Sequence, residues 1–194
     1  MKRLVVFASG SGSNAQRVAE YFKEKGTARI IGIYCNRSDA YVLKRAEKMD
    51  IPAVVFDKEA FFRSEEILRR LEALSPDLIV LAGFLWKMPD HILRAFPQKV
   101  INIHPALLPK YGGKGMYGDH VHRAVIAAGE KESGISVHYV NERYDEGAVV
   151  LQARCPVMPD DTPETLAKRI HALEYAYFPV VIEQILGLKN HSSD

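Results

Sequence analysis

Two polar residues near the end of one β-rich segment have the types and spacing that proton transfer needs. The segment INIHPALLPKY, residues 101–111, places Asn102 two positions before His104. Side chains alternate along a strand, so these two face one way while Ile101 and Ile103 pack the other way. An amide donor beside a titratable imidazole could stabilise an oxyanion and move a proton, as acyl transfer requires. The alternative is a hydrogen-bonded histidine of the core, and these residues alone do not decide between the two hypotheses.

Asp145 is the acidic residue that could complete this pair. It lies in RYDEGAVV, within the short segment 141–147 that separates two predicted strands. Acidic residues and glycine are ordinary turn formers, so a purely structural role in the turn is the default interpretation. A catalytic role would require the turn to fold towards His104.

A glycine-rich segment, ASGSGSN at residues 8–14, lies between the first predicted strand and the first predicted helix. Glycines let the backbone approach a ligand, and the free N–H groups at a helix start favour an anion such as phosphate. The segment matches neither GxGxxG nor the lysine-bearing P-loop. It predicts a phosphate site, with a tight turn capped by Ser13 as the alternative.

The remaining polar and aromatic segments have simpler interpretations. LAGFLWKM, residues 81–88, fits core packing, although a flat aromatic ligand could also rest there. His120 and His122 are two apart on a predicted helix and point in different directions, which argues against a shared metal. His138 is assigned to a strand face. A solvated helix surface accounts for the basic cluster of Lys44, Arg45 and Lys48.

Strand and helix signals alternate through the first two-thirds of the chain. Strands are predicted at residues 4–8, 29–35, 53–56, 78–82 and 100–103, and helices at 14–25, 40–49, 62–74 and from Pro89. The alternation predicts an α/β fold with a Rossmann-like, doubly wound, mostly parallel sheet. Ligands of such sheets bind at the carboxyl ends of the strands.

The last third has a different pattern. Two strands at residues 135–140 and 149–157 flank a short connection, so an antiparallel hairpin is expected to extend the sheet. A helix is predicted from Pro163, and Pro179 should kink or end it. We expect a single domain over residues 1–190, with a phosphate-binding half (1–100), a catalytic half (101–190) and a frayed tail at 191–194.

Composition excludes several classes of protein. The 47% hydrophobic content supports a sizeable core, and a net charge of +2 argues against a nucleic-acid track or an anionic membrane surface. Cys35 and Cys155 lack CxxC spacing, so neither a disulfide framework nor a zinc site is predicted. The apolar run at the N-terminus is too short for a signal peptide, and no run approaches the roughly 20 residues of a membrane span. We therefore expect a cytoplasmic protein without nucleic-acid or membrane partners.

Five ordered segments carry a family resemblance: SGSGSN, SPDLIVLAGF, NIHPALLPKY, SVHYV through YDEGAVVLQA, and HALEYAYFP. In their order and spacing the chain resembles the glycinamide ribonucleotide formyltransferases, which are folate-dependent formyltransferases, over nearly all of its length. The resemblance implies the formyltransferase fold. It also implies transfer of the formyl group of 10-formyltetrahydrofolate to the amine of glycinamide ribonucleotide, which yields formylglycinamide ribonucleotide and tetrahydrofolate in purine biosynthesis.

The resemblance also implies roles for particular residues. The implied catalytic trio is Asn102, His104 and Asp145. The implied acceptor site has the phosphate on Gly12, Ser13 and Asn14, and the ribose hydroxyls on Glu174. The implied folate site comprises Arg63, Leu85, Trp86, Lys87, Met88 and Asn102. No metal is implied, the partners are small molecules, and the chain would be a monomer or a homodimer.

The chain departs from the usual family pattern in three places. These are FFRSEEI around Arg63, the pair Trp86-Lys87, and the loop YGGKGMYGDHVH, which is longer and richer in glycine than usual. Residues 111–119 of this loop contain four glycines, and we expect them to form a mobile lid over bound folate.

Three alternative functions remain open. Methionyl-tRNA formyltransferase and 10-formyltetrahydrofolate hydrolase share the formyl-folate site, but the first carries a further C-terminal domain and the second an extra N-terminal regulatory domain. A non-catalytic sugar-phosphate-binding module would need only the Rossmann-like half. The pair Asn102 and His104 favours an enzyme over such a module, because a binder has no need of them.

Overall fold

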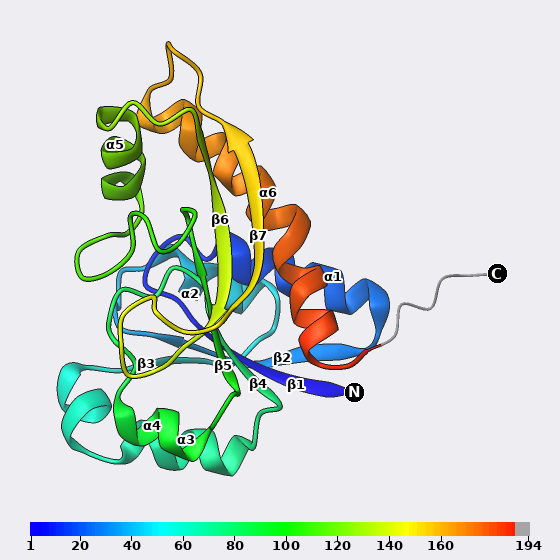
Figure 1. Ribbon diagram of the computed structural model, residues 1–194. Helices are drawn as coiled ribbons and strands as arrows, with labels where there is room; N and C mark the ends of the chain where they lie inside the picture. The colour runs from blue at the N-terminus through cyan, green and yellow to red at the C-terminus, as the bar shows by residue number, and fades with distance from the viewer. Residues whose placement is uncertain (189–194) are drawn as a thin grey trace.

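The computed structural model describes residues 1–188, and one seven-stranded sheet runs through it in the order β3-β2-β1-β4-β5-β6-β7 (Figure 1). The strands are β1 (Lys2–Phe7), β2 (Ala28–Cys35), β3 (Ala53–Val55), β4 (Leu78–Leu81), β5 (Val100–His104), β6 (Glu132–Tyr139) and β7 (Val149–Pro156). Strands β1 to β5 pair in parallel, whereas β6 and β7 are antiparallel. The predicted parallel sheet with a hairpin extension is confirmed, while the expected tail at 191–194 lies outside the described residues.

Helices cover both faces of this sheet. They are α1 (Ser13–Lys25), α2 (Tyr41–Lys48), α3 (Glu66–Leu74), α4 (Asp90–Ala95), α5 (Asp119–Ala127) and α6 (Pro163–Ile185). One apolar core joins α1, α2, α5 and α6 to the sheet, and a second core joins α3 and α4 to its other face (Figure 1). Within residues 1–188, no helix has the length and apolar character needed to span a membrane.

Strand β1 shows how the two cores form. Leu4 and Val6 point into the first core, and Val5 and Phe7 point into the second. All four side chains are fully buried, because alternate residues of a strand face opposite sides and helices cover both. An uninterrupted apolar run is therefore the pattern that this position in the sheet requires.

The helix predicted over residues 62–74 is wrong in its extent. A π-helical turn, η1, covers Glu59–Arg63, and α3 begins only at Glu66. The two are separated at Ser64, which has an extended ψ of 162° while its N–H donates to the carbonyl of Glu59. Arg63, the last residue of η1, has a side chain that is 79% exposed.

Pro179 was expected to kink or end the last helix, and it does not end it. Helix α6 begins after Thr162, which caps it in a capping box with Pro163 in the first turn, and it continues through Pro179 to its end at Ile185. Proline has no N–H for the carbonyl four residues earlier, which here belongs to Tyr175. Arg17 of α1 supplies the missing donor, because its Nε lies 3.2 Å from that carbonyl oxygen.

The direction of strand order reverses between β1 and β4, which is where open α/β sheets bind ligands. The loops that follow these two strands are tied to each other. Ser9 N–H donates to the carbonyl of Gly83 at 3.0 Å, and Leu85 N–H donates to Ser9 Oγ at 3.0 Å. The sheet therefore holds the glycine-rich loop and the residue 82–88 segment side by side at its carboxyl edge.

Candidate active site

A cavity of about 640 Å³ opens at this edge of the sheet. Its walls come from the glycine-rich loop, the segment after β4, the end of β5, the loop at residues 113–119 with the start of α5, the β6–β7 connection and one face of α6. The predicted site residues that line it are Gly12, Ser13, Asn14, Leu85, Trp86, Lys87, Met88, Asn102, His104, Asp145 and Glu174. Arg63 is the one predicted site residue that does not line the cavity.

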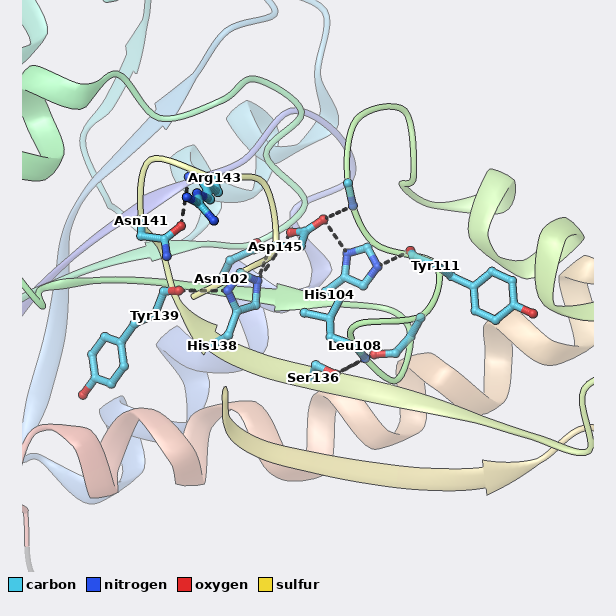
Figure 2. A network of polar contacts seen from close by, with 12 residues as sticks. Asn102, His104, Leu108, Tyr111, Ser136, His138, Tyr139, Asn141, Arg143 and Asp145 are labelled. Carbon is cyan, nitrogen blue, oxygen red and sulfur yellow. Dashed lines mark hydrogen bonds and ion pairs between the residues drawn. The ribbon is translucent and has the colours of Figure 1, made fainter. Parts of the chain in front are cut away.

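His104 ends β5 with its imidazole held between two acceptors (Figure 2). Its Nε2 donates to the carbonyl of Tyr111 at 2.7 Å, and its Nδ1 lies 3.7 Å from Asp145 Oδ2. The residue is only 3% exposed. Burial lowers the pKa of His104 below its usual range, while the Asp145 carboxylate and the Tyr111 carbonyl oppose that shift. At rest the imidazole is therefore biased towards its neutral form. Asp145 lies beside Nδ1, where it can accept a hydrogen bond when that nitrogen binds a proton.

Asp145 lies in the β6–β7 connection, which folds back over β5 so that the carboxylate reaches two histidines. Its Oδ1 is 3.5 Å from His138 Nε2, and its Oδ2 accepts a hydrogen bond of 2.9 Å from Gly113 N–H. Burial alone would raise the pKa of Asp145, but His138, His104 and the Gly113 N–H together outweigh it and lower the pKa. The turn meets the geometric condition that a catalytic Asp145 requires, since it folds towards His104.

His138 is a member of this cluster that the sequence did not reveal. It stands directly opposite Asn102 in the β5–β6 pairing, and its Nε2 lies 3.2 Å from Asn102 Nδ2. The other ring nitrogen, Nδ1, donates to the carbonyl of Tyr139 at 2.9 Å. With that proton on Nδ1, Nε2 accepts from the Asn102 amide when the ring is neutral, and it can donate to Asp145 Oδ1 only when the ring carries a second proton. The position of His138 within its own strand does not reveal this role. Pairing the two predicted strands in register would have revealed it, because the pairing places His138 opposite Asn102.

The glycine-rich loop presents free backbone donors to the cavity. Gly12 has a left-handed φ of 74° and occupies the N-cap of α1, so Ser13 is the first helical residue rather than the cap. A Cβ at Gly12 would lie 2.6 Å from the Cβ of Val42, so the position admits no side chain. The hydrogen bonds found over residues 1–188 include none donated by the backbone N–H groups of residues 11–14. Such a set of donors at a helix start suits an anion.

Glu174 is buried beside this loop and is not the solvated helix residue that its position suggests. Its Oε2 accepts from Asn14 Nδ2 at 2.9 Å and pairs with His171 Nδ1 at 2.9 Å. The contact with Glu174 raises the pKa of His171, although burial opposes the shift. With Oε2 committed to these partners, Oε1 remains as the acceptor for a ligand.

The opposite part of the cavity is aromatic. Trp86 packs in a cluster with four phenylalanines, at centroid distances between 5.6 and 6.4 Å, and Lys58 Nζ lies 6.0 Å from its ring centroid. Arg63 instead points to solvent, with a side chain 79% exposed that pairs with Glu59 at 3.4 Å. Lys87, next to Trp86, is the cation that lines this part of the cavity, whereas Lys58 lies over the Trp86 ring without lining the cavity.

The histidine pair on α5 behaves as its spacing predicts. His120 is exposed, while His122 is 2% exposed and lines the cavity with an Nδ1 that has no hydrogen-bond partner. Burial lowers the pKa of His122. Over residues 1–188, no group of three or more histidine, cysteine or acidic side chains is arranged to hold a metal ion.

The fold and this cavity define a formyl transferase. The family model described as formyl transferase matches residues 2–182, so the chain belongs to that family. Its curated relatives include phosphoribosylglycinamide formyltransferases. The Bacillus subtilis enzyme is 37% identical over 98% of this chain and 97% of its own length. The chloroplastic Arabidopsis thaliana enzyme is also 37% identical, and the match spans 95% of this chain but 65% of that protein.

Solved structures of similar proteins agree with this assignment. Glycinamide ribonucleotide transformylase 1 from Symbiobacterium toebii superposes with a TM-score of 0.88 at 35% identity, covering 96% of this chain and 88% of that one. The corresponding protein from Geobacillus kaustophilus gives a TM-score of 0.86 at 38% identity, covering 96% and 100%. The family match over residues 2–182 includes every strand of the sheet, and with them the hairpin that carries His138 and Asp145.

Proposed function

We propose that this chain transfers the formyl group of 10-formyltetrahydrofolate to the amine of glycinamide ribonucleotide, a step of purine biosynthesis. The observation that carries the proposal is the meeting of Asn102, His104 and Asp145 between an anion-binding loop and an aromatic wall in one cavity. The free and buried Cys35 and Cys155 suit a reducing cytoplasm.

The two ends of the cavity suggest how the substrates lie. The acceptor's phosphate would take the free N–H groups at Gly12, Ser13 and Asn14, and its ribose hydroxyls would donate to Oε1 of Glu174. The pterin would lie along residues 85–88, beside the Trp86 ring. The formyl carbon and the amine would then meet at Asn102 and His104, which lie between the two ends.

The chemistry needs three changes at the formyl carbon. The acceptor's amine attacks that carbon, and the carbonyl oxygen becomes an oxyanion to which Asn102 Nδ2 donates. A proton leaves the attacking nitrogen and is delivered to the folate nitrogen, with His104 and an ordered water as carriers. The bond from carbon to the folate nitrogen then breaks, the carbonyl re-forms, and tetrahydrofolate departs. The protonated form of His104 donates to the oxyanion beside Asn102, and Asp145 stabilises this imidazolium, so the reaction needs His104 protonated.

The loop at residues 111–119 is coupled to this chemistry through its backbone. The Tyr111 carbonyl occupies His104 Nε2, and the Gly113 N–H occupies Asp145 Oδ2. Movement of the loop would therefore change the partners of both groups. We propose that folate binding repositions this loop, which frees His104 Nε2 for the substrate while the loop closes the cavity.

One assay separates this function from its alternatives. Consumption of 10-formyltetrahydrofolate is measured with glycinamide ribonucleotide, with methionyl-tRNA and with water alone. We expect rapid turnover only with the ribonucleotide. Equal turnover in water alone would identify a hydrolase, turnover with tRNA a tRNA formyltransferase, and binding of the ribonucleotide without turnover a sugar-phosphate-binding module.

A further inference from the structure

We propose that Arg45 of α2 is a positioning residue for the acceptor's phosphate, because it aims the backbone N–H groups of the glycine-rich loop into the cavity. The inference deepens the proposed function, since it concerns the same phosphate site. Arg45 does not line the cavity itself, so it acts from behind the loop.

Arg45 links three parts of the structure. Its Nε donates to the carbonyl of Ser11 at 2.8 Å, and its guanidinium also contacts the side-chain oxygen of Gln16 on α1. The guanidinium carbon lies 5.0 Å from the ring centroid of Tyr41, which supports it from the other side. These contacts join the loop, the first turn of α1 and α2 into one unit.

A second contact from α2 acts on the neighbouring peptide. Val42 N–H donates to the carbonyl of Gly10 at 3.0 Å, so two successive carbonyls of the loop, those of Gly10 and Ser11, are bound by α2. In a trans peptide the C=O and N–H bonds point in opposite directions. The N–H groups of Ser11 and Gly12 must therefore point away from α2. They join the free N–H groups of the first turn of α1.

This role distinguishes Arg45 from the other two residues of the basic cluster. Lys44 and Lys48 are exposed, as expected of a solvated helix face, whereas Arg45 is half-buried and bonded to the loop. Lys44 also lies near the same Tyr41 ring, at 5.9 Å, but it makes no hydrogen bond to the loop. The chain thus offers a matched control with the same charge, on the same helix, at the next position.

The test compares Arg45→Met with Lys44→Met. The readouts are kcat and the KM for each substrate, together with the binding of inorganic phosphate by calorimetry. We expect Arg45→Met to raise the KM for glycinamide ribonucleotide and the Kd of phosphate by about 10- to 100-fold, the effect of losing a charged hydrogen bond. The KM for the formyl-folate donor should stay within about twofold, and Arg45→Lys should recover part of the loss.

Two results would overturn the proposal. Equal effects of Arg45→Met and Lys44→Met would show that only the positive charge matters, and an unchanged phosphate Kd in Arg45→Met would show that the loop does not need the arginine. If Arg45→Met fails to fold, Arg45→Gln takes its place. Its amide retains a donor, so its phosphate Kd should rise by less than about 10-fold but still above that of Lys44→Met, and a Kd equal to that of Lys44→Met would overturn the proposal. Phosphate binding is measured without formyl transfer, so failure of the proposed function would appear separately, as a native chain that binds phosphate but does not turn over.

Discussion

Replacing Asp145 with asparagine tests whether the carboxylate and His104 form one proton-handling unit. The substitution keeps the size of the side chain and an oxygen that can accept from Gly113 N–H. It removes the negative charge that lies 3.7 Å from His104 Nδ1 and 3.5 Å from His138 Nε2. The change is therefore mainly electrostatic.

The distance sets the size of the effect. Two unit charges about 4 Å apart interact by about 1 kcal/mol in water and about 4 kcal/mol at an effective dielectric constant of about 20. These energies correspond to rate losses of about fivefold and about 1,000-fold. The Asp145 side chain is 12% exposed, which excludes the water limit, so we expect kcat to fall by on the order of 100-fold.

The pH profile should move as well, and its direction follows from the opposing effects on His104. Asp145 raises the pKa of His104, whereas burial lowers it, so removing the carboxylate takes away the largest effect that opposes burial and lowers the pKa further. The imidazolium is then lost at a lower pH. The alkaline limb of the kcat profile in Asp145→Asn should shift towards lower pH.

The assay is kcat against pH for Asp145→Asn, His104→Ala and the double variant, with Glu146→Gln as the control. Glu146 is exposed and pairs with Arg143 at 3.4 Å, so its substitution removes the same charge one residue further along the chain. His104→Ala should lower kcat by roughly 10²- to 10⁴-fold, and the double variant should be little worse. Fully multiplicative losses with a fixed alkaline limb would refute the unit and leave Asp145 as a turn residue.

Three further predictions concern the cavity walls. Gly12→Ala should lower Tm, because the φ of Gly12 is 74° and Val42 fills the space that a Cβ would take. Gly10→Ala, whose Cβ would meet nothing within 4 Å, should leave Tm unchanged and raise the acceptor's KM. Equal Tm values for the two variants would contradict this. Lys58→Met should raise the KM for the formyl-folate donor severalfold, since Lys58 lies over the Trp86 ring that lines the cavity, and Arg63→Met should not. The reverse order would favour the folate role that the sequence assigned to Arg63. Protease cleavage within residues 111–119 should slow when a folate analogue binds, and an unchanged rate at saturation would remove the lid role.

The fold could be predicted because the signals that indicate it lie within short stretches of the sequence. The apolar run of β4 and the alternation of strand and helix signals indicate a sheet that is covered on both faces, and the structure has that sheet. The extent of individual helices was less predictable where a distant group intervenes. Pro179 lies inside α6, and the carbonyl that it leaves free accepts a hydrogen bond from Arg17 on another helix.

The candidate site was predictable only in part, for a similar reason. Asn102 and His104 reveal themselves by their spacing on one strand, but His138 joins them only through the pairing of β5 with β6. Arg45 is indistinguishable in sequence from its solvated neighbours Lys44 and Lys48, because its contact with Ser11 spans 34 residues. The spacing of residues within one strand or helix indicates only which of its residues share a face. The roles of His138 and Arg45 depend on which other part of the chain packs against that face.

The β5–β6 register shows why the hairpin, an addition to the parallel sheet, is needed for the chemistry. It sets His138 against Asn102 and Ser136 against His104. While His138 is neutral it anchors one N–H of the Asn102 amide, and the second N–H remains for the oxyanion. Ser136 Oγ accepts from Leu108 N–H and donates to the Ala106 carbonyl, which fixes the turn that follows His104. A slip of one residue in this pairing would turn His138 and Ser136 to the other face of the sheet, so the same register that extends the sheet also assembles the proton-handling groups.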